Sequence, residues 1–494
     1  MRCPLHLRSA LVLAVFAILE SSACTVPLAP GFHVEREQAQ AEFVSGASPR
    51  LHIHGRYHLI NSGNASLSSL DVLLPNPDAV ARENLQVTVD GAPAEVAPIL
   101  ADDAGRTSVP SEIRLPKAWP EKQRMALEVD FDIAAANGRS VLLAENGFAL
   151  DYYAWFPRFQ APKRFLARVN ERASPTDVSL IVPRDFTAAS AGQALGKRQR
   201  GSQTEYRFRL RTGDPDPFLV SGRYNQQSVN AADSTVIFWT FANLPSDAAQ
   251  HAAQEIGVAA SFFDRTFGAR SKKGKPPIWI VESPVSPAAP PSDRASQTLP
   301  DVVLLAPDLV AQDISRGQVT DAELTLLAQT WTRWSAFPRA DERFLGPSLA
   351  TYAVNAWHEL REGTSARNVR IAALIHSYDE HAQPQQSPAS GTPPKSPRPT
   401  MTREKASLFL AALDDQCTPS RVHQGLAYAL VALRGREYGY DDLRSALYSE
   451  GCQNLPPSFR VWLNQPGIPE DFRSRYVPLT PATSEAAAPS KPER

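Results

Sequence analysis

The chain has 494 residues, of which 43% are hydrophobic and 21% are charged, a composition that supports packed globular domains. Its length predicts two or three of them. The 51 lysines and arginines nearly balance the 52 acidic residues, so no overall field of one sign draws in a polyanion, and we expect no nucleic-acid partner.

Residues 1–23 have the character of a signal peptide. Two arginines give a positive start, and residues 10–19 form an apolar run that is too short to span a bilayer. Small residues then precede Cys24, an order that resembles the lipobox of bacterial lipoproteins, although Ser21 stands where that motif prefers leucine. We expect an exported, lipid-anchored protein of the cell envelope. Ordinary cleavage after Ala23, which would give a soluble periplasmic or secreted protein, is the alternative.

The next part of the chain is rich in predicted strands. After a linker at residues 24–40, apolar and polar residues alternate at 51–59 with the period of two that is typical of a half-buried strand. We therefore predict an all-β sandwich or saddle over residues 41–232. The same alternation recurs at 85–90, 125–132, 178–182 and 205–210. The polar face of the first strand carries three histidines, which we interpret as solvated, with a metal pair as the alternative: His52, His54 and His58.

From about residue 248 the hydrophobic period changes to 3.6, which predicts helices. Two short apolar runs, at 278–281 and 302–305, predict buried strands. We therefore predict a mixed and then helical domain over residues 233–476. Its helices are expected at 248–267, 321–335, 347–362, 366–378, 402–414 and 421–433. Polar, proline-rich stretches predict a disordered insert at 382–400 and a disordered tail at 477–494.

Four cysteines occur in the sequence, of which Cys3 lies in the predicted signal peptide and Cys24 is the predicted lipid-attachment residue. The other two, Cys417 and Cys452, are an even pair in an oxidising compartment, which favours a disulfide. Two buried free thiols are the alternative.

Five segments carry a wider resemblance. They are Asp151–Phe159 (DYYAWFPRF), Thr204–Tyr224, Phe262–Gly268, Lys275–Pro284 (KPPIWIVESP) and Val461–Pro469 (VWLNQPGIP). In this order they resemble the membrane alanyl aminopeptidase family, the gluzincin aminopeptidases, over roughly residues 40–476. The resemblance implies an α+β multidomain protein, with an N-terminal β-sandwich or saddle domain followed by a thermolysin-like mixed and then helical peptidase-like domain.

The zinc motif of that family is H-E-x-x-H-x-W, in which two histidines one helical turn apart bind Zn²⁺ and the glutamate acts as general base. The matching stretch here ends at Trp334, which stands at the tryptophan position and sets the register. Ala328 and Thr332 stand at the two histidine positions, and Gln329 stands at the position of the base. Alanine offers no ligand atom, and glutamine does not accept a proton near neutral pH.

Three further positions that the resemblance implies are also substituted. Pro347 stands at the third zinc ligand, Thr298 at the glutamate that binds the substrate amine, and Arg403 at the tyrosine that stabilises the oxyanion. The resemblance therefore implies a degenerate member of the family, for which we expect no zinc cofactor. The vestigial catalytic positions are Ala328, Gln329, Thr332, Pro347 and Arg403.

These substitutions predict a non-catalytic, aminopeptidase-like envelope protein that binds a peptide or protein partner. In the family this neighbourhood borders the peptide cleft, so the candidate cleft residues are Trp331, Arg333, Tyr352 and Arg403. At helical spacing, Trp331 and Tyr352 are also compatible with the hydrophobic core.

Two alternatives stay open. The first is an active zinc metallopeptidase with a relocated site that uses His358, His376 or His381, although His358–Glu362 (HELRE) also fits a solvated helix surface. The second is an envelope enzyme of another class in the old cleft. No nucleophile-elbow, P-loop or dinucleotide motif supports that second alternative.

Overall fold

The computed structural model describes residues 31–46, 48–99, 108–134, 141–159, 175–211, 217–270, 275–284, 296–339, 342–382, 402–452, 462 and 467–477. The predicted signal peptide and Cys24 lie outside these residues. So do the predicted insert beyond Ala382 and the predicted tail beyond Val477. Within the described part of the chain, no helix is both long and apolar enough to cross a membrane.

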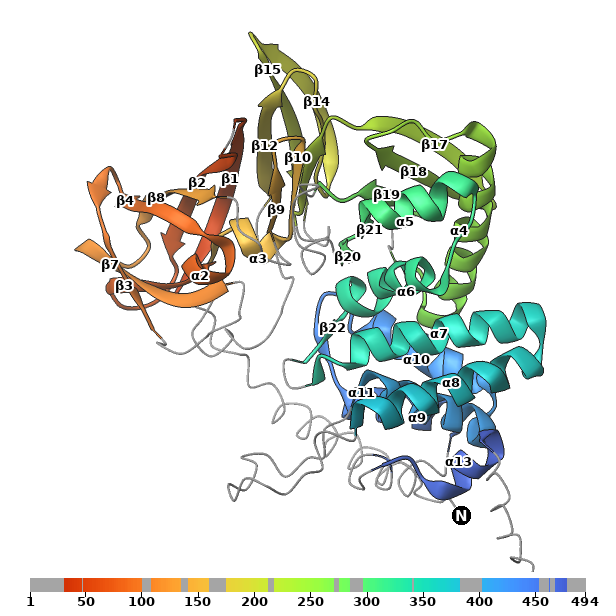
Figure 1. The fold of residues 1–494 in the computed structure, drawn as a ribbon. Coiled ribbons are helices and arrows are strands. Elements are labelled where there is room, and N and C mark those ends of the chain that lie inside the picture. Colours follow the sequence, from red (N-terminus) through yellow and green to blue (C-terminus); the bar gives the residue numbers. More distant parts are fainter. Residues whose placement is uncertain are drawn as a thin grey trace, which may run out of the picture.

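An eight-stranded sheet dominates the N-terminal half, with strand order β14-β15-β12-β1-β2-β8-β4-β5 (Figure 1). Burial alternates along its long strands because successive side chains point to opposite faces, so one face packs inward and the other is polar. Its strands are β1 (Phe32–Val44), β2 (Arg50–Asn61), β4 (Arg82–Val89), β5 (Ala92–Pro93), β8 (Arg124–Ala134), β12 (Thr176–Pro183), β14 (Gln193–Arg200) and β15 (Gln203–Leu210).

The first strand begins earlier than the sequence predicted. Strand β1 starts at Phe32, inside the range 24–40 that was assigned to a linker, so residues 32–40 belong to the sheet. This strand pairs with β2 from Phe32 to Val44 and with β12 from Glu37 to Glu42. Its polar composition (FHVEREQAQAEFV) concealed it, because apart from Phe32 only Ala39, Ala41 and Phe43 are buried.

Two four-stranded sheets complete the N-terminal part, together with the short helices α2 (Pro77–Val80) and α3 (Tyr152–Trp155). One sheet has the order β13 (Thr187–Ala189), β16 (Leu219–Gly222), β10 (Gly147–Leu150) and β9 (Val141–Ala144). The other has the order β11 (Arg158–Phe159), β3 (Leu67–Pro75), β7 (Ser108–Trp119) and β6 (Glu95–Pro98). Trp155 is fully buried, and its indole donates a hydrogen bond to the carbonyl of Pro217 at 2.9 Å. The predicted β-rich domain is therefore present.

A five-stranded sheet follows, flanked by the long helix α4 (Ser246–Phe267), which closely matches the predicted helix. Trp239, Val281 and Leu304 from this sheet belong to the same buried cluster as Trp155, so the two parts share a hydrophobic core. The strand order is β17 (Asn225–Ala231), β18 (Ser234–Thr240), β19 (Ile278–Glu282), β21 (Val302–Leu305) and β20 (Gln297–Leu299). Helix α5 (Pro307–Gln312) and the turn η3 (Ile314–Arg316) lead out of the sheet.

The C-terminal part is helical, as predicted, and forms the lower right of Figure 1. The helix predicted at 321–335 is instead divided into α6 (Asp321–Gln329) and a π-helical turn, η4 (Thr330–Ser335). The remaining helices are α7 (Leu345–Glu362), α8 (Thr364–Ala382), α9 (Arg403–Cys417), α10 (Pro419–Ala432), α11 (Tyr440–Ser449) and α13 (Glu470–Tyr476). Two short strands, β22 (Phe337–Pro338) and β23 (Glu437–Tyr438), pair in parallel beside η4.

Candidate functional site

The predicted catalytic positions converge where η4, α7 and α9 meet. The hydroxyl of Thr332 in η4 donates a hydrogen bond to the carbonyl of Gly346 in α7, at 2.8 Å. The hydroxyl of Ser348, two residues further along α7, donates to the carbonyl of Arg403 at the start of α9, at 3.0 Å. Because Pro347 lies between these two α7 residues, the structure brings Thr332, Pro347 and Arg403 into one neighbourhood.

Helix α6 positions the first half of this site. Its N-terminus is a capping box, in which the backbone N–H of Thr320 donates to the Glu323 carboxylate at 2.6 Å. Two turns later Ala328 is fully buried, and Gln329 is half-buried at the end of the helix. Strand β20, which holds the buried Thr298, packs against α6 and η4. The predicted amine-binding position therefore lies close to the predicted zinc helix.

Protein groups fill the interior of this site. Thr332 is fully buried, and its carbonyl accepts a hydrogen bond from the Tyr438 hydroxyl at 2.6 Å. A methyl group added at Gly346 would lie only 3.3 Å from the same carbonyl, so α7 and η4 are in close contact. Arg403 is exposed and pairs with its neighbour Glu404 at 3.0 Å. The side chain of Trp334 lies outside the described part.

The residues at these positions do not fit a zinc ion. A structural or catalytic zinc site needs three or four donor atoms at about 2.0–2.3 Å. Ala328 and Pro347 have no donor in their side chains, and the Thr332 hydroxyl is already bonded to Gly346. Over the residues that the structure describes, no three histidine, cysteine, aspartate or glutamate side chains are grouped so that they could hold a metal. No zinc-dependent step is therefore assigned to these residues.

Two of the four candidate cleft residues belong to the hydrophobic core. The Trp331 indole donates to Asp264 at 3.0 Å and lies edge to face with Phe263, with centroids 5.7 Å apart. Tyr352 is also buried. Arg333 is half-buried and Arg403 is exposed. The cavities described over the eight-stranded sheet and between α6, α7 and α8 include none of the four.

Sequence reasoning did not find the buried ionisable cluster around Tyr352. Its hydroxyl donates to the Asp414 carboxylate at 2.7 Å, and burial raises the pKa of Asp414 to about 7. The ring of His423 lies 5.9 Å from that of Tyr352, and burial lowers the pKa of His423 to about 4. Asp414 and His423 come from different helices, and nothing in their local sequence distinguishes them from surface residues.

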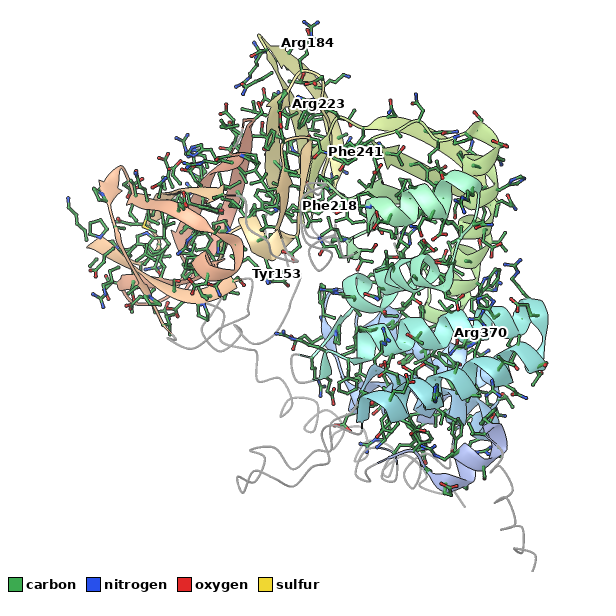
Figure 2. The ribbon with its side chains drawn as sticks, viewed as in Figure 1. Tyr153, Arg184, Phe218, Arg223, Phe241 and Arg370 are labelled. Carbon is green, nitrogen blue, oxygen red and sulfur yellow. The ribbon has the colours of Figure 1, made fainter. Side chains whose placement is uncertain are left out.

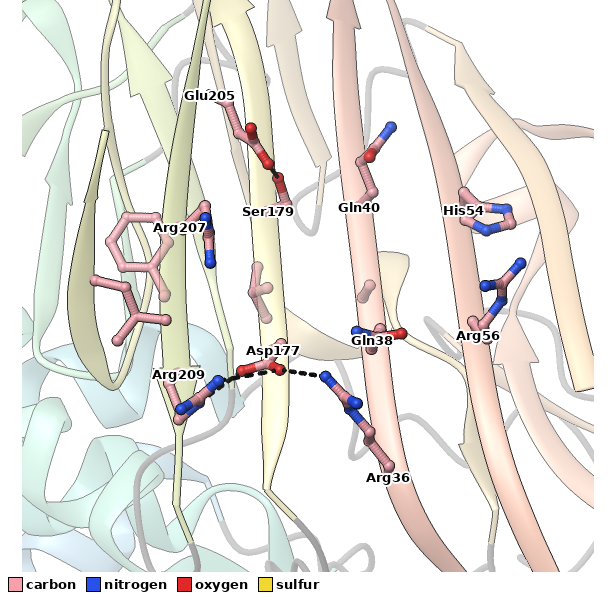
Figure 3. Close-up of a pocket in the computed structure, with 14 residues that line it drawn as sticks. Arg36, Gln38, Gln40, His54, Arg56, Asp177, Ser179, Glu205, Arg207 and Arg209 are labelled. Carbon is pink, nitrogen blue, oxygen red and sulfur yellow. Dashed lines mark hydrogen bonds and ion pairs between the residues drawn. The ribbon is translucent and has the colours of Figure 1, made fainter. Parts of the chain in front are cut away.

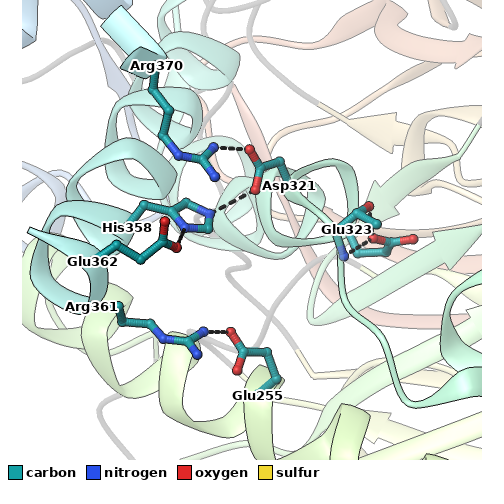
Figure 4. A network of polar contacts seen from close by, with 8 residues as sticks. Glu255, Asp321, Glu323, His358, Arg361, Glu362 and Arg370 are labelled. Carbon is teal, nitrogen blue, oxygen red and sulfur yellow. Dashed lines mark hydrogen bonds and ion pairs between the residues drawn. The ribbon is translucent and has the colours of Figure 1, made fainter. Parts of the chain in front are cut away.

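The rival metal site at His358 is a surface ion-pair network (Figure 4). One ring nitrogen lies 2.5 Å from the Glu362 carboxylate and the other lies 2.8 Å from Asp321. Arg370 pairs with the same aspartate. Both nitrogens are therefore engaged, and the neighbouring guanidinium repels a cation. His376 is exposed and pairs with Glu380, at 3.1 Å. The side chain of His381 lies outside the described residues.

The two cysteines of the predicted disulfide lie close together as free, buried thiols. Burial, followed by the side-chain contact with Cys452, raises the pKa of Cys417 to about 12. The structure thus brings the two thiols into contact without a bond between them. The disulfide stays a prediction.

Comparisons with known proteins find similarity at the level of the fold. No protein-family model matches the chain, and no curated protein matches its sequence. Among solved structures it is similar to an M1 zinc metallopeptidase from Deinococcus radiodurans, with 13% identity and a TM-score of 0.62, covering 89% of this chain and 95% of that one.

Further structures of M1 zinc metallopeptidases are similar to the same degree. A mutant of the Deinococcus radiodurans enzyme bound to a Tyr-Ser-Ala substrate has 14% identity and a TM-score of 0.61, covering 89% of this chain and 95% of that one. A two-domain M1 zinc metallopeptidase mutant bound to L-tryptophan has a TM-score of 0.60 at 14% identity, covering 89% of this chain and 96% of that one. At such identities the likeness establishes a shared fold: this chain has the two-domain architecture of the M1 zinc metallopeptidases.

Proposed function

We propose that this chain is a non-catalytic, aminopeptidase-like protein that binds a peptide or protein partner in the cell envelope. The observation that supports this most directly is the chemistry of Ala328, Thr332 and Pro347. They lie in one neighbourhood of a peptidase-like fold, offer no set of metal ligands, and two of them are fully buried. In this proposal the fold is retained as a binding scaffold while the zinc site is lost.

The decisive experiment measures zinc and turnover in the purified protein. The zinc content of the purified protein, measured by inductively coupled plasma mass spectrometry, should be well below one ion per chain. No dye should be released from aminoacyl-anilide substrates. Zinc bound one to one, together with turnover that a chelator abolishes, would contradict the proposal.

A variant that restores the ligands tests the register on which the proposal depends. It combines Ala328→His, Gln329→Glu, Thr332→His and Pro347→Glu. Position 347 lies in the first turn of α7, where the negative charge of a glutamate is favourable because it faces the positive end of the helix dipole. The restored variant should bind more zinc than the wild type. Equal zinc content in both proteins would show that these positions are not the ligand positions.

Turnover measurements on a histidine variant test the alternative of an active zinc metallopeptidase with a relocated site. Turnover in the wild type that is lost in His358→Ala would support that alternative. Chelator-insensitive hydrolysis would instead indicate an enzyme of another class.

Export and lipid attachment form a separate part of the proposal. The order of residues around Cys24 supports a lipid anchor, with plain signal cleavage as the alternative. Expression in a bacterial host should place the wild type in the membrane fraction and Cys24→Ala in the soluble envelope fraction. The same soluble distribution for both would contradict the lipid anchor.

A further inference from the structure

The polar face of the eight-stranded sheet carries side chains in regular cross-strand rows. In one row Arg209 of β15 lies beside Asp177 of β12, followed by Gln38 of β1 and Arg56 of β2. The next row, two residues further along each strand, consists of Arg207, Ser179, Gln40 and His54. Since neighbouring strands lie about 4.8 Å apart, the rows form a polar grid about 14 Å wide.

A cavity of about 410 Å³ lies over this grid (Figure 3). Its volume falls in the range of roughly 300–1,000 Å³ that is usual for ligand sites. The lining holds four arginines and two carboxylates: Arg36, Arg56, Arg207 and Arg209 against Asp177 and Glu205. We refer to it below as the sheet groove.

Both carboxylates of the sheet groove are already engaged. Asp177 accepts hydrogen bonds from Arg209 at 2.7 Å and from Arg36 at 3.4 Å, so two guanidiniums share one carboxylate. Glu205 accepts from Ser179 at 2.9 Å and also pairs with Arg200 at 2.8 Å. Arg56 donates to Glu128, outside the lining, at 2.8 Å. The excess of positive charge in the lining therefore comes from Arg207 and from the two guanidiniums that share Asp177.

Several donors in the sheet groove have no protein partner. Among the described residues, the guanidinium of Arg207 and the amides of Gln38 and Gln40 make no hydrogen bond or ion pair. The hairpin at this end of the sheet, residues 193–211, contains six lysines and arginines but one glutamate. All of β14 is exposed. Although the whole chain is nearly neutral, this end of the sheet attracts anions.

The opposite end of the same face is acidic, and two of its carboxylates are paired with histidines. His52 lies 3.0 Å from Asp132, and His54 lies 2.7 Å from Asp130. These contacts make the two histidines part of a polar ladder on this face of the sheet. An anionic ligand is therefore directed toward the β15 end and repelled from the β8 end.

The spacing of the arginines and glutamines in the sheet groove points to an extended peptide. Alternate side chains of an extended chain lie about 6.8 Å apart, which matches the separation of Arg207 from Arg209 along β15 and of Gln38 from Gln40 along β1. A ligand carboxylate can bind the unpartnered guanidinium of Arg207, and a second one, at an alternate position, can share the guanidinium of Arg209 with Asp177. Primary amides both donate and accept, as a peptide backbone requires. We propose that the sheet groove binds an extended acidic segment of a partner protein.

This site is separate from the predicted catalytic positions, which lie on η4, α7 and α9. The inference therefore stands whether or not the chain cleaves peptides. Failure of the zinc and turnover experiment would leave it unaffected.

The test uses a fluorescein-labelled hexapeptide of alternating glutamate and threonine, titrated with the full-length protein and followed by fluorescence anisotropy. Binding should saturate at one peptide per chain and weaken as sodium chloride is raised, because exposed charges are screened. Arg207→Ala should weaken binding about tenfold, since it removes a charge-assisted hydrogen bond. Arg207→Lys should lose less, because it keeps the charge.

The matched control is Arg184→Ala, which removes an exposed arginine from the same end of the molecule but outside the sheet groove (Figure 2). It should change affinity less than about twofold. Neither arginine side chain has a protein partner among the described residues, so both variants should keep the wild-type melting temperature.

Four outcomes would overturn the proposal. One is the absence of saturable binding, and a second is equal binding of an alternating lysine–threonine peptide. A third is an equal loss in Arg184→Ala and Arg207→Ala, which would indicate unspecific attraction. The fourth is binding of a sulfated polysaccharide that depends on Arg207 while the peptide does not bind.

Discussion

Thr332 and Tyr438 are hydrogen-bonded in the turn where the sequence resemblance puts the second zinc-binding histidine. The threonine hydroxyl donates to Gly346 at 2.8 Å, and the tyrosine hydroxyl donates to the threonine carbonyl at 2.6 Å. Both groups are neutral and hydrogen-bonded, so their burial carries no unpaired charge. Protein atoms therefore satisfy both the hydroxyl and the carbonyl of Thr332.

Asp414 should make the stability of the protein depend on pH. Burial raises its pKa from 3.8 to about 7, so the folded state holds the proton more tightly than the unfolded state. The free energy of unfolding should therefore fall as pH rises from about 4 to about 7, by up to about 4 kcal/mol from this group. Asp414→Asn keeps an acceptor for Tyr352 and removes this dependence.

Urea denaturation of both proteins at several pH values measures the effect. The stability difference should move in favour of Asp414→Asn as pH rises. Asp308→Asn, at an exposed position in α5, controls for the loss of one negative charge. A difference that stays constant with pH would contradict the prediction.

The thiols of Cys417 and Cys452 should form a disulfide when the protein folds under oxidising conditions. Both are buried and close together, so the bond closes without a large rearrangement. Cys452→Ser should then lower stability by roughly 2–4 kcal/mol, because the unfolded chain regains freedom. Thiol titration of the unfolded protein without reductant checks this. Two titratable thiols from Cys417 and Cys452 would show that the bond does not form.

At the scale of elements, the close approach of α4 to β17 requires a glycine at position 257. Gly257 faces the carbonyl of Ala231, and a methyl group there would lie 2.6 Å from that oxygen. Gly257→Ala should therefore destabilise the protein by about 1–3 kcal/mol, although alanine favours helix by about 1 kcal/mol.

Thermal unfolding of two variants of α4 checks this requirement. Gln254→Ala, on the exposed side of the same helix, should be nearly neutral. Equal melting temperatures for Gly257→Ala and the wild type would mean that the helix can move away from the strand.

The π-helical turn η4 also belongs to this scale. The sequence predicted one continuous helix over residues 321–335, and the geometry changes after Gln329. Thr330 donates to the carbonyl of Leu327 at 2.8 Å, and the backbone N–H of Gly435 donates to the carbonyl of Ser335 at 2.8 Å. The contact from Gly435, which is distant in the sequence, therefore helps to determine where η4 ends. Local helix propensity does not contain this information.

At the scale of the whole molecule, the chain should be stable without metal. Its five-stranded sheet contributes to two buried clusters: Trp239 and Val281 pack with the N-terminal sheets, and Phe238 and Ile280 pack with the C-terminal helices. Ala328 and Thr332 supply no set of metal ligands, so we expect no metal at these positions for a chelator to remove. The melting temperature should therefore be the same with and without EDTA, because only a bound metal contributes linkage energy.

The ligand-restored variant is the positive control for that measurement, and its melting temperature should fall with EDTA. A fall in the wild type would indicate a tightly held metal and contradict the whole-molecule prediction.

The sequence by itself determined most elements of this protein. Period-two alternation located strands such as β2, β8 and β12, and period 3.6 located α4, α7 and α10, because these periods are set locally by backbone geometry. The sequence also shows that alanine and proline side chains cannot bind zinc, because this depends only on the residue type.

Only the tertiary structure decided which polar and aromatic residues meet. Trp331 and Tyr352 lie in the core, Asp414 is buried beside Tyr352, and Arg207 and Gln40 face one groove from strands far apart in the chain. Burial, pKa shifts and cross-strand rows arise from contacts between distant segments. No local pattern in the sequence carries that information.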